Sequence, residues 1–190
     1  TVRELVAGGV SISVTGEGYS TTGEFLENGK KTSLPAVAEQ LLLVGILCNN
    51  ARLKSETVLG DPTEGALLVS AGKKNMEYES LQNTYKRVDE VPFSSDRKFM
   101  STVHVTKSGF IVCSKGAVEA TLDRCSYMLD AKGRQVKLTA SDKKAIINRT
   151  NALSSQALRV LGFAQKETSA QPAGEAIESD LTFVGLQAMM

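Results

Sequence analysis

Three strand-like segments follow one another between residues 87 and 114 without a helix between them, and this run limits the possible folds more than any other feature of the sequence. The segments are RVDEVPF, FMSTVHV and FIVCS, and a short polar turn, TKSG, joins the last two. Strands connected by short turns pair in antiparallel fashion, because parallel strands need long crossover connections. We therefore expect an α+β fold with a largely antiparallel β-sheet and helices packed on it.

Three longer segments carry the start signals of helices, and they flank this run of strands. In SLPAVAEQLLLVGILCNN, Ser33 is the expected N-cap of a buried helix with a proline inside its first turn. In GDPTEGALLVSAGKK, Asp61 is the expected N-cap and Pro62 the first helical residue. A third helix is expected to begin after Thr139, because Asp142 three residues later suits a capping box.

The remaining segments complete a single domain over residues 1–190. A short helix is expected from Ala117 towards Cys125. The stretch ETSAQPAGEAIESD is expected to be an exposed loop rather than a domain boundary. Further strands are expected in the opening segments RELVAGG and VSISVTG and in the closing segments RVLGFAQK and LTFVGLQAM.

Charge and composition exclude several classes of protein. The formal net charge is +1, so we expect no nucleic-acid partner and no direct membrane contact by this chain. The longest apolar run, LLLVGILC, has eight residues, whereas a membrane-spanning helix needs roughly 20. The three cysteines lack CxxC spacing, which favours a reducing cytosol and argues against a zinc site. The first residues show no signal peptide and begin abruptly, as in a fragment of a longer protein.

Lys115 and Gly116 end an apolar strand and are the first candidate site residues. A phosphate-binding loop of the GxxxxGK[ST] type requires the glycines before the lysine, and here the order is reversed. A strand-end lysine next to a glycine would allow a ligand to approach the backbone closely. The alternative is a solvated lysine followed by a glycine that turns the chain into the next helix.

Phe93 and Glu64 are two further candidates, each with a structural alternative. Phe93 precedes five consecutive polar residues and could stack on a flat ring or merely cover the edge of the sheet. Glu64 could accept a hydrogen bond from an exocyclic amino group such as that of adenine. As the third residue of its helix it could equally close a capping box with Asp61.

Arg159 could direct its guanidinium at phosphate, or it could be a solvated residue at the start of a strand. His104 is the single histidine and has no cluster of Cys, Asp or Glu near it in the sequence, which argues against a metal site or a catalytic triad.

The joint order of these signals resembles a known family. GDPTEGAL, VPFSSDRKFMS, SKGAVEATLDRC and LRVLGFA are similar to motifs in the nucleotide-binding domain of P-type cation-transporting ATPases, particularly the calcium-pump-like group. The resemblance spans nearly the whole chain and implies the α+β fold of that domain.

The resemblance implies a role for each of six residues. Phe93 would stack on adenine, with Lys98 and Lys115 in the same pocket. Glu64 would lie near the adenine amino group, and Arg159 would face the phosphates. Gly116 would keep the floor of the pocket open.

The resemblance also implies that this chain is one domain of a larger membrane transporter. ATP would be the ligand, Mg²⁺ would arrive with the nucleotide, and the phosphorylation and actuator domains of the same parent chain would be the partners, on the cytoplasmic side of the membrane. No DKTGT motif, whose aspartate accepts the phosphate, occurs here, so this chain alone is expected to bind nucleotide without hydrolysing it and to supply no catalytic residue. The alternative is a regulatory or interaction domain that keeps the fold but has lost nucleotide binding.

Overall fold

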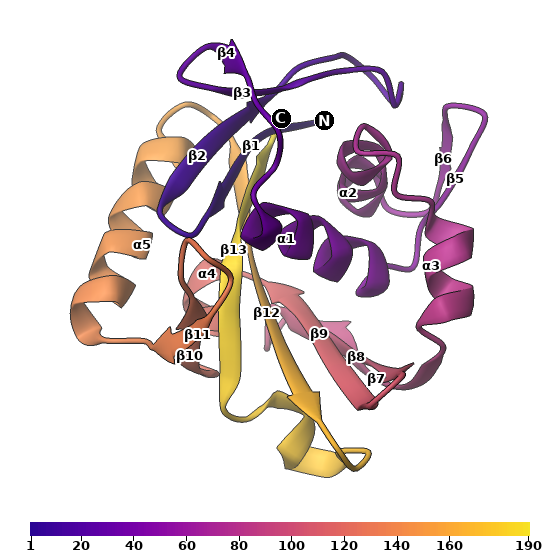
Figure 1. The fold of residues 1–190 in the computed structure, drawn as a ribbon, viewed down its shortest axis with the longest axis vertical. Coiled ribbons are helices and arrows are strands. Elements are labelled where there is room, and N and C mark those ends of the chain that lie inside the picture. The colour runs from indigo at the N-terminus through magenta and orange to yellow at the C-terminus, as the bar shows by residue number, and fades with distance from the viewer.

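The computed structural model describes residues 1–190 and confirms the α+β fold with a large, mainly antiparallel sheet. Eleven strands form this sheet, and its central path runs β4-β3-β2-β1-β13-β12-β9-β8-β7 (Figure 1). The pairing of β10 with β13 is the parallel one, and the other strand pairs are antiparallel. The strands of the sheet and of a separate two-stranded hairpin are β1 Val2–Ala7, β2 Val10–Val14, β3 Phe25–Glu27, β4 Lys30–Lys31, β5 Arg52–Lys54, β6 Thr57–Leu59, β7 Arg87–Ser94, β8 Phe99–Thr106, β9 Gly109–Gly116, β10 Cys125–Leu129, β11 Gln135–Lys137, β12 Arg159–Thr168 and β13 Leu181–Met189.

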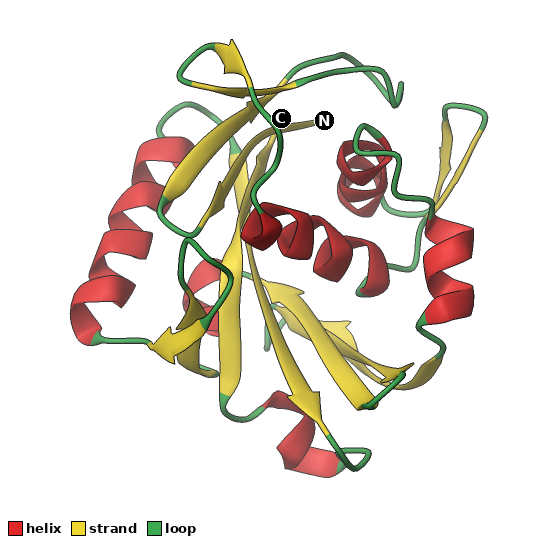
Figure 2. Cartoon of the chain, in the orientation of Figure 1, coloured by secondary structure: helices red, strands yellow, loops and turns green.

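Helices cover both faces of the sheet, as the two sides of Figure 2 show. One hydrophobic core lies under α1 and α2, and a second lies under α4 and α5. Strand β13 contributes side chains to both cores, with Phe183 and Leu186 in the second core and Val184 in the first. All nine of its residues are buried for that reason. The helices are α1 Ala36–Leu47, α2 Pro62–Gly72, α3 Tyr78–Thr84, α4 Val118–Leu122, α5 Ala140–Ser154 and the 3₁₀ helix Gly174–Glu178.

The expected helix starts are confirmed for α2 and α5. The Asp61 side chain accepts hydrogen bonds from the first turn of α2, where Pro62 is the first helical residue. Thr139 and Asp142 form the reciprocal capping box at the start of α5. None of the helices is long and apolar enough to cross a membrane.

The prediction that Ser33 caps the first long helix was wrong. Helix α1 begins at Ala36, its N-cap position is Pro35, and no side chain caps it. The steric clash of a proline ring with the preceding residue disfavours helical geometry for Leu34, so the helix cannot begin before the proline. Leu34 is buried instead and joins the core under α1.

The stretch 167–180 is more ordered than the expected exposed loop. It contains the end of β12 and the 3₁₀ helix, and Ile177 is buried in the second core. Glu178 pairs with Arg97 and accepts a hydrogen bond of 2.7 Å from Ser101 Oγ. One apolar residue and one carboxylate therefore fix this segment against the sheet.

Candidate functional site

A cavity of about 250 Å³ lies where the ends of α1, β7 and β9 meet the first turn of α2. It brings together five of the six predicted site residues, although they are up to 95 positions apart in the sequence. The lining residues are Asn50, Asp61, Thr63, Glu64, Phe93, Met100, Lys115, Gly116, Arg159 and Leu161.

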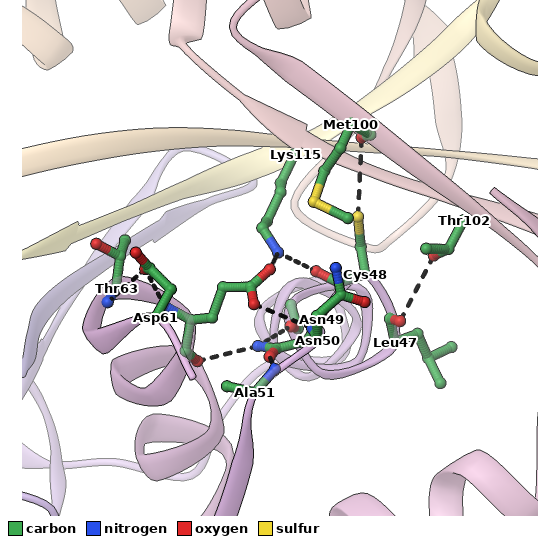
Figure 3. Close-up of polar contacts among 12 residues, drawn as sticks. Leu47, Cys48, Asn49, Asn50, Ala51, Asp61, Thr63, Met100, Thr102 and Lys115 are labelled. Carbon is green, nitrogen blue, oxygen red and sulfur yellow. Dashed lines mark hydrogen bonds and ion pairs between the residues drawn. The ribbon is translucent and has the colours of Figure 1, made fainter. Parts of the chain in front are cut away.

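Lys115 and Glu64 form a largely buried ion pair at this cavity. The distance from Lys115 Nζ to Glu64 Oε1 is 2.6 Å, and the side chains are only 8% and 13% exposed. The ammonium also donates to the carbonyl oxygen of Cys48 at the end of α1 (Figure 3). The alternative of a solvated strand-end lysine is therefore wrong. Antiparallel pairing with β8, where Met100 lies opposite Lys115, fixes the position of the lysine in the sheet.

The alternative in which Glu64 closes a capping box is also wrong. Asp61 Oδ1 accepts hydrogen bonds from the backbone N–H groups of Thr63 and Glu64, at 2.8 and 3.1 Å. The Glu64 carboxylate does not return a bond to Asp61. Its Oε2 atom instead accepts from the backbone N–H of Asn50, at 3.1 Å, while Oε1 faces Lys115. The stronger attraction of a nearby ammonium draws the carboxylate away from the cap and across the cavity.

Asn49 ties the end of α1 to the start of α2. Its buried side-chain amide donates to the carbonyl oxygens of Gly45 and Glu64, at 3.1 and 3.0 Å. Its Oδ1 atom accepts from the backbone N–H of Ala51 at 2.9 Å. The two helix ends that frame the cavity therefore hold a fixed distance from each other.

Arg87 holds the same helix end from the opposite side. Its guanidinium donates to the carbonyl oxygens of Leu47 and Asn49, at 3.1 and 2.7 Å, and to Asn50 Oδ1 at 2.8 Å. A cation suits this position, because the last carbonyls of a helix carry partial negative charge. Sequence analysis missed Asn49, Asn50 and Arg87. Two consecutive asparagines directly after an apolar helix were the available signal.

Phe93 is 57% exposed and lies at the mouth of the cavity. It belongs to the edge strand β7, where the pairing with β8 is irregular between Val91 and Ser94. Pro92 in this gap has no N–H to donate to a ladder, as expected for an edge strand. An aromatic ring this exposed can serve as a stacking surface for a flat ligand.

Gly116 lines the cavity. We expected a glycine at this position in order to keep the floor of the pocket open, but the structure shows another reason for the absence of a side chain. A Cβ atom here would collide with the carbonyl oxygen of Lys98 and lie 2.9 Å from the Cα atom of Phe99 on β8. The close approach of two strands therefore requires glycine at this position.

Arg159 lines the cavity, whereas Lys98 is not among its lining residues. The Arg159 guanidinium donates to Thr63 Oγ1 at 3.2 Å. Lys98 is exposed on the turn between β7 and β8, with a left-handed backbone φ of 52°. Its backbone carbonyl accepts from Ala117 at the start of α4.

The titratable groups beneath the site are held in their neutral forms. Burial raises the pKa of the Cys48 thiol and raises that of Cys113 well above its usual range. Burial lowers the pKa of His104 to about 4, and the ring nitrogens contact the Tyr85 carbonyl and Thr102 Oγ1. No group of three or more His, Cys, Asp or Glu side chains is arranged to hold a metal ion.

The chain is thus an α+β domain whose mainly antiparallel sheet is covered by helices on both faces. The small, partly polar cavity over one strand end is of the kind that binds small ligands. A family model described as "P-type ATPase, cytoplasmic domain N" matches residues 37–190. The chain therefore belongs to this family, as its motifs indicated.

Curated relatives agree with this assignment. The chain is 39% identical to the cation-transporting ATPase pma1 of Synechocystis, over 100% of the chain and 22% of that protein. It is 40% identical to calcium-transporting ATPase 1 of Bacillus cereus, over 80% of the chain and 17% of that protein. It is 34% identical to a calcium-transporting ATPase of Bacillus subtilis, over 100% of the chain and 22% of that protein. The chain thus spans about a fifth of the length of these relatives.

Proposed function

We propose that this chain binds ATP at the cavity and holds it by the adenine ring. The observation that carries the proposal is the meeting of Glu64, Phe93, Lys115 and Arg159, from four separate motifs, around one cavity. The family to which the chain belongs supports ATP as the nucleotide.

The chemistry of the lining suits an adenine base. The exposed ring of Phe93 offers a stacking surface, and stacking of a base on an aromatic ring contributes about 1–3 kcal/mol. The Glu64 carboxylate can accept a hydrogen bond from the exocyclic amino group. A volume of about 250 Å³ is below the roughly 300–1,000 Å³ of pockets for drug-sized ligands, so the base enters and the phosphates extend outside.

The phosphates would then lie towards the exposed cations at the rim. Arg159 is the lining residue suited to them, since its guanidinium matches phosphate geometry. Lys98 would reach them from its exposed turn rather than from within the cavity. Mg²⁺ would be carried by the phosphates, because this ion keeps several waters and binds proteins through few ligands.

In the intact parent, we propose that this domain delivers the γ-phosphate to an aspartate on a phosphorylation domain outside the chain. The phosphorylated aspartate would drive cation transport, with the actuator domain as the other partner and this domain on the cytoplasmic side of the membrane. The chain would contribute positioning rather than a nucleophile, so alone it would not turn over ATP.

The test is a titration of the isotope-labelled chain with ATP, without and then with Mg²⁺, followed by amide shifts in NMR spectra. We expect saturable shifts around Glu64, Phe93 and Lys115, with a Kd on the order of 0.1 to a few mM. Phe93→Ala should abolish most of this response. The matched control is Leu59→Ala, because Leu59 is equally exposed, at 59%, and does not line the cavity.

Two results would contradict the proposal. Absence of shifts at several millimolar ATP would favour the regulatory domain that has lost its ligand. Hydrolysis of ATP by the purified chain would show that it contains a nucleophile-activating centre of its own.

A further inference from the structure

Asn50 lines the cavity, and its side chain has a hydrogen-bond donor left over. Its backbone N–H donates to Glu64 Oε2 at 3.1 Å, so the asparagine and the carboxylate are direct neighbours. Its side-chain Oδ1 accepts from Arg87 Nη1 at 2.8 Å. The side-chain NH₂ group has no partner within the chain, and the residue is exposed and lines the cavity. Figure 3 shows Asn50 beside Asn49 at the end of α1, on the side of Lys115.

The orientation of this amide follows from its partner. Arginine has donors only, so the atom that faces Arg87 must be the amide oxygen and not the nitrogen. Arg87 is itself held by the carbonyl oxygens of Leu47 and Asn49 and pairs with Glu90. The oxygen of Asn50 is thereby committed to the guanidinium, and the NH₂ group is the part of the side chain available to a ligand.

We propose that Asn50 is a specificity residue for the base, donating from Nδ2 to a ring nitrogen of adenine while Glu64 accepts from the adjacent amino group. This inference rests on the proposed function. An acceptor from Glu64 beside a donor from Asn50 matches adenine, because the amino donor of adenine has an acceptor nitrogen on either side of it. Guanine carries an oxygen acceptor in place of that amino group, and this oxygen would meet the Glu64 carboxylate.

The experiment removes one hydrogen-bonding group at a time, from the base or from the protein. The affinities of the chain, of Asn50→Ala and of Asn50→Asp are measured by NMR titration for ATP, 1-deaza-ATP and 7-deaza-ATP. Each analogue keeps the amino group and lacks one of the two flanking ring nitrogens. Asn151→Ala is the matched control, because Asn151 is an exposed asparagine on α5 outside the cavity.

We expect the unmodified chain to bind one of the two analogues about three- to tenfold more weakly than ATP, the range for one lost hydrogen bond. Asn50→Ala should weaken ATP binding by a similar factor and should no longer distinguish that analogue from ATP. Asn151→Ala should retain both the affinity and the distinction.

Asn50→Asp separates the donor from the packing of the side chain. It retains an acceptor for Arg87 and nearly the same shape, but it has no donor. The new charge weakens ATP and its analogues equally, so the ratio of their affinities still reports the hydrogen bond. We expect that ratio to fall to about one.

The outcomes distinguish this inference from the proposed function. If ATP shifts Phe93 and Glu64 but Asn50→Ala keeps the affinity and the distinction of the unmodified chain, the role of Asn50 is refuted and ATP binding stands. Equal affinity of the unmodified chain for all three nucleotides refutes it as well. If no ATP binds to the unmodified chain, both proposals fail together.

Discussion

Replacing Lys115 by methionine tests whether the ion pair at the cavity is a structural element of the fold. Methionine is unbranched like lysine and one atom shorter, but it carries no charge, which leaves Glu64 with the N–H of Asn50 as its remaining partner. Breaking a buried pair by removing one partner costs about 3–5 kcal/mol, because the other charge stays buried and uncompensated. With the two side chains 8% and 13% exposed, we expect the lower end, about 3 kcal/mol.

The assay is urea unfolding, with thermal unfolding as a second measurement. A loss of about 3 kcal/mol corresponds to a fall of about 6–12 °C in Tm for a domain of this size. The double variant Lys115→Met with Glu64→Gln should recover much of the loss, because it removes the uncompensated carboxylate.

A matched control lies at the edge of the sheet. Lys31 and Glu24 form an ion pair at the same distance, 2.6 Å, but their side chains are 73% and 50% exposed. Lys31→Met should therefore cost no more than about 1 kcal/mol. Equal effects of Lys31→Met and Lys115→Met on the unfolding free energy would refute the argument that burial, rather than distance, determines how strongly the cavity pair stabilises the fold.

Two further predictions concern His104, beneath the site, and Gly116, which lines the cavity. The pKa of buried His104 is about 4, below its ordinary value of 6.5, so the unfolded chain takes up the proton first and stability falls as the pH drops below 6.5. In urea unfolding, the free energy of unfolding should fall by about 2 kcal/mol between roughly pH 7 and 5. If His104→Gln left this pH dependence of the unfolding free energy unchanged, the assignment to His104 would be contradicted. Gly116→Ala places a Cβ atom against the carbonyl of Lys98 and should lower the unfolding free energy by about 1–3 kcal/mol, whereas an unchanged urea midpoint would show that β8 can yield.

The fold was predictable from the sequence where local signals and packing agree. Local turn and capping residues mark the strands β7, β8 and β9 and the helices α2 and α5, so the sequence alone predicts these elements. The hairpin of β5 and β6, the helix α3 and the strands β10 and β11 were not predicted. These elements are short and partly exposed, so they lack the long apolar pattern that marks a strand or helix, and β10 in addition pairs with β13, which is distant in the sequence.

The types of the site residues were predictable, but the interactions among them were not. Motif order pointed to Glu64, Phe93 and Lys115, and the cavity contains all three. The pairing of Lys115 with Glu64 spans 51 positions, and no local pattern encodes it. Each residue taken alone had an adequate local explanation, a cap for the glutamate and solvation for the lysine, and only the tertiary contact excludes both.

That contact also explains how Lys115 could serve a nucleotide without depending on one. An ammonium has three N–H donors, and the chain supplies acceptors for two of them, Glu64 Oε1 and the Cys48 carbonyl. The buried charge is therefore compensated by the protein itself, and one donor remains for a ligand. Under the proposed function, a bound nucleotide would therefore add a single hydrogen bond at this residue instead of neutralising an unpaired charge. One such bond contributes about 1.5–3 kcal/mol, which agrees with the weak ATP binding proposed above. Compared with the single variant Glu64→Gln, the double variant Lys115→Met with Glu64→Gln should weaken ATP binding by no more than about 150-fold, and a larger difference between the two variants would show that Lys115 carries more than one contact to the nucleotide.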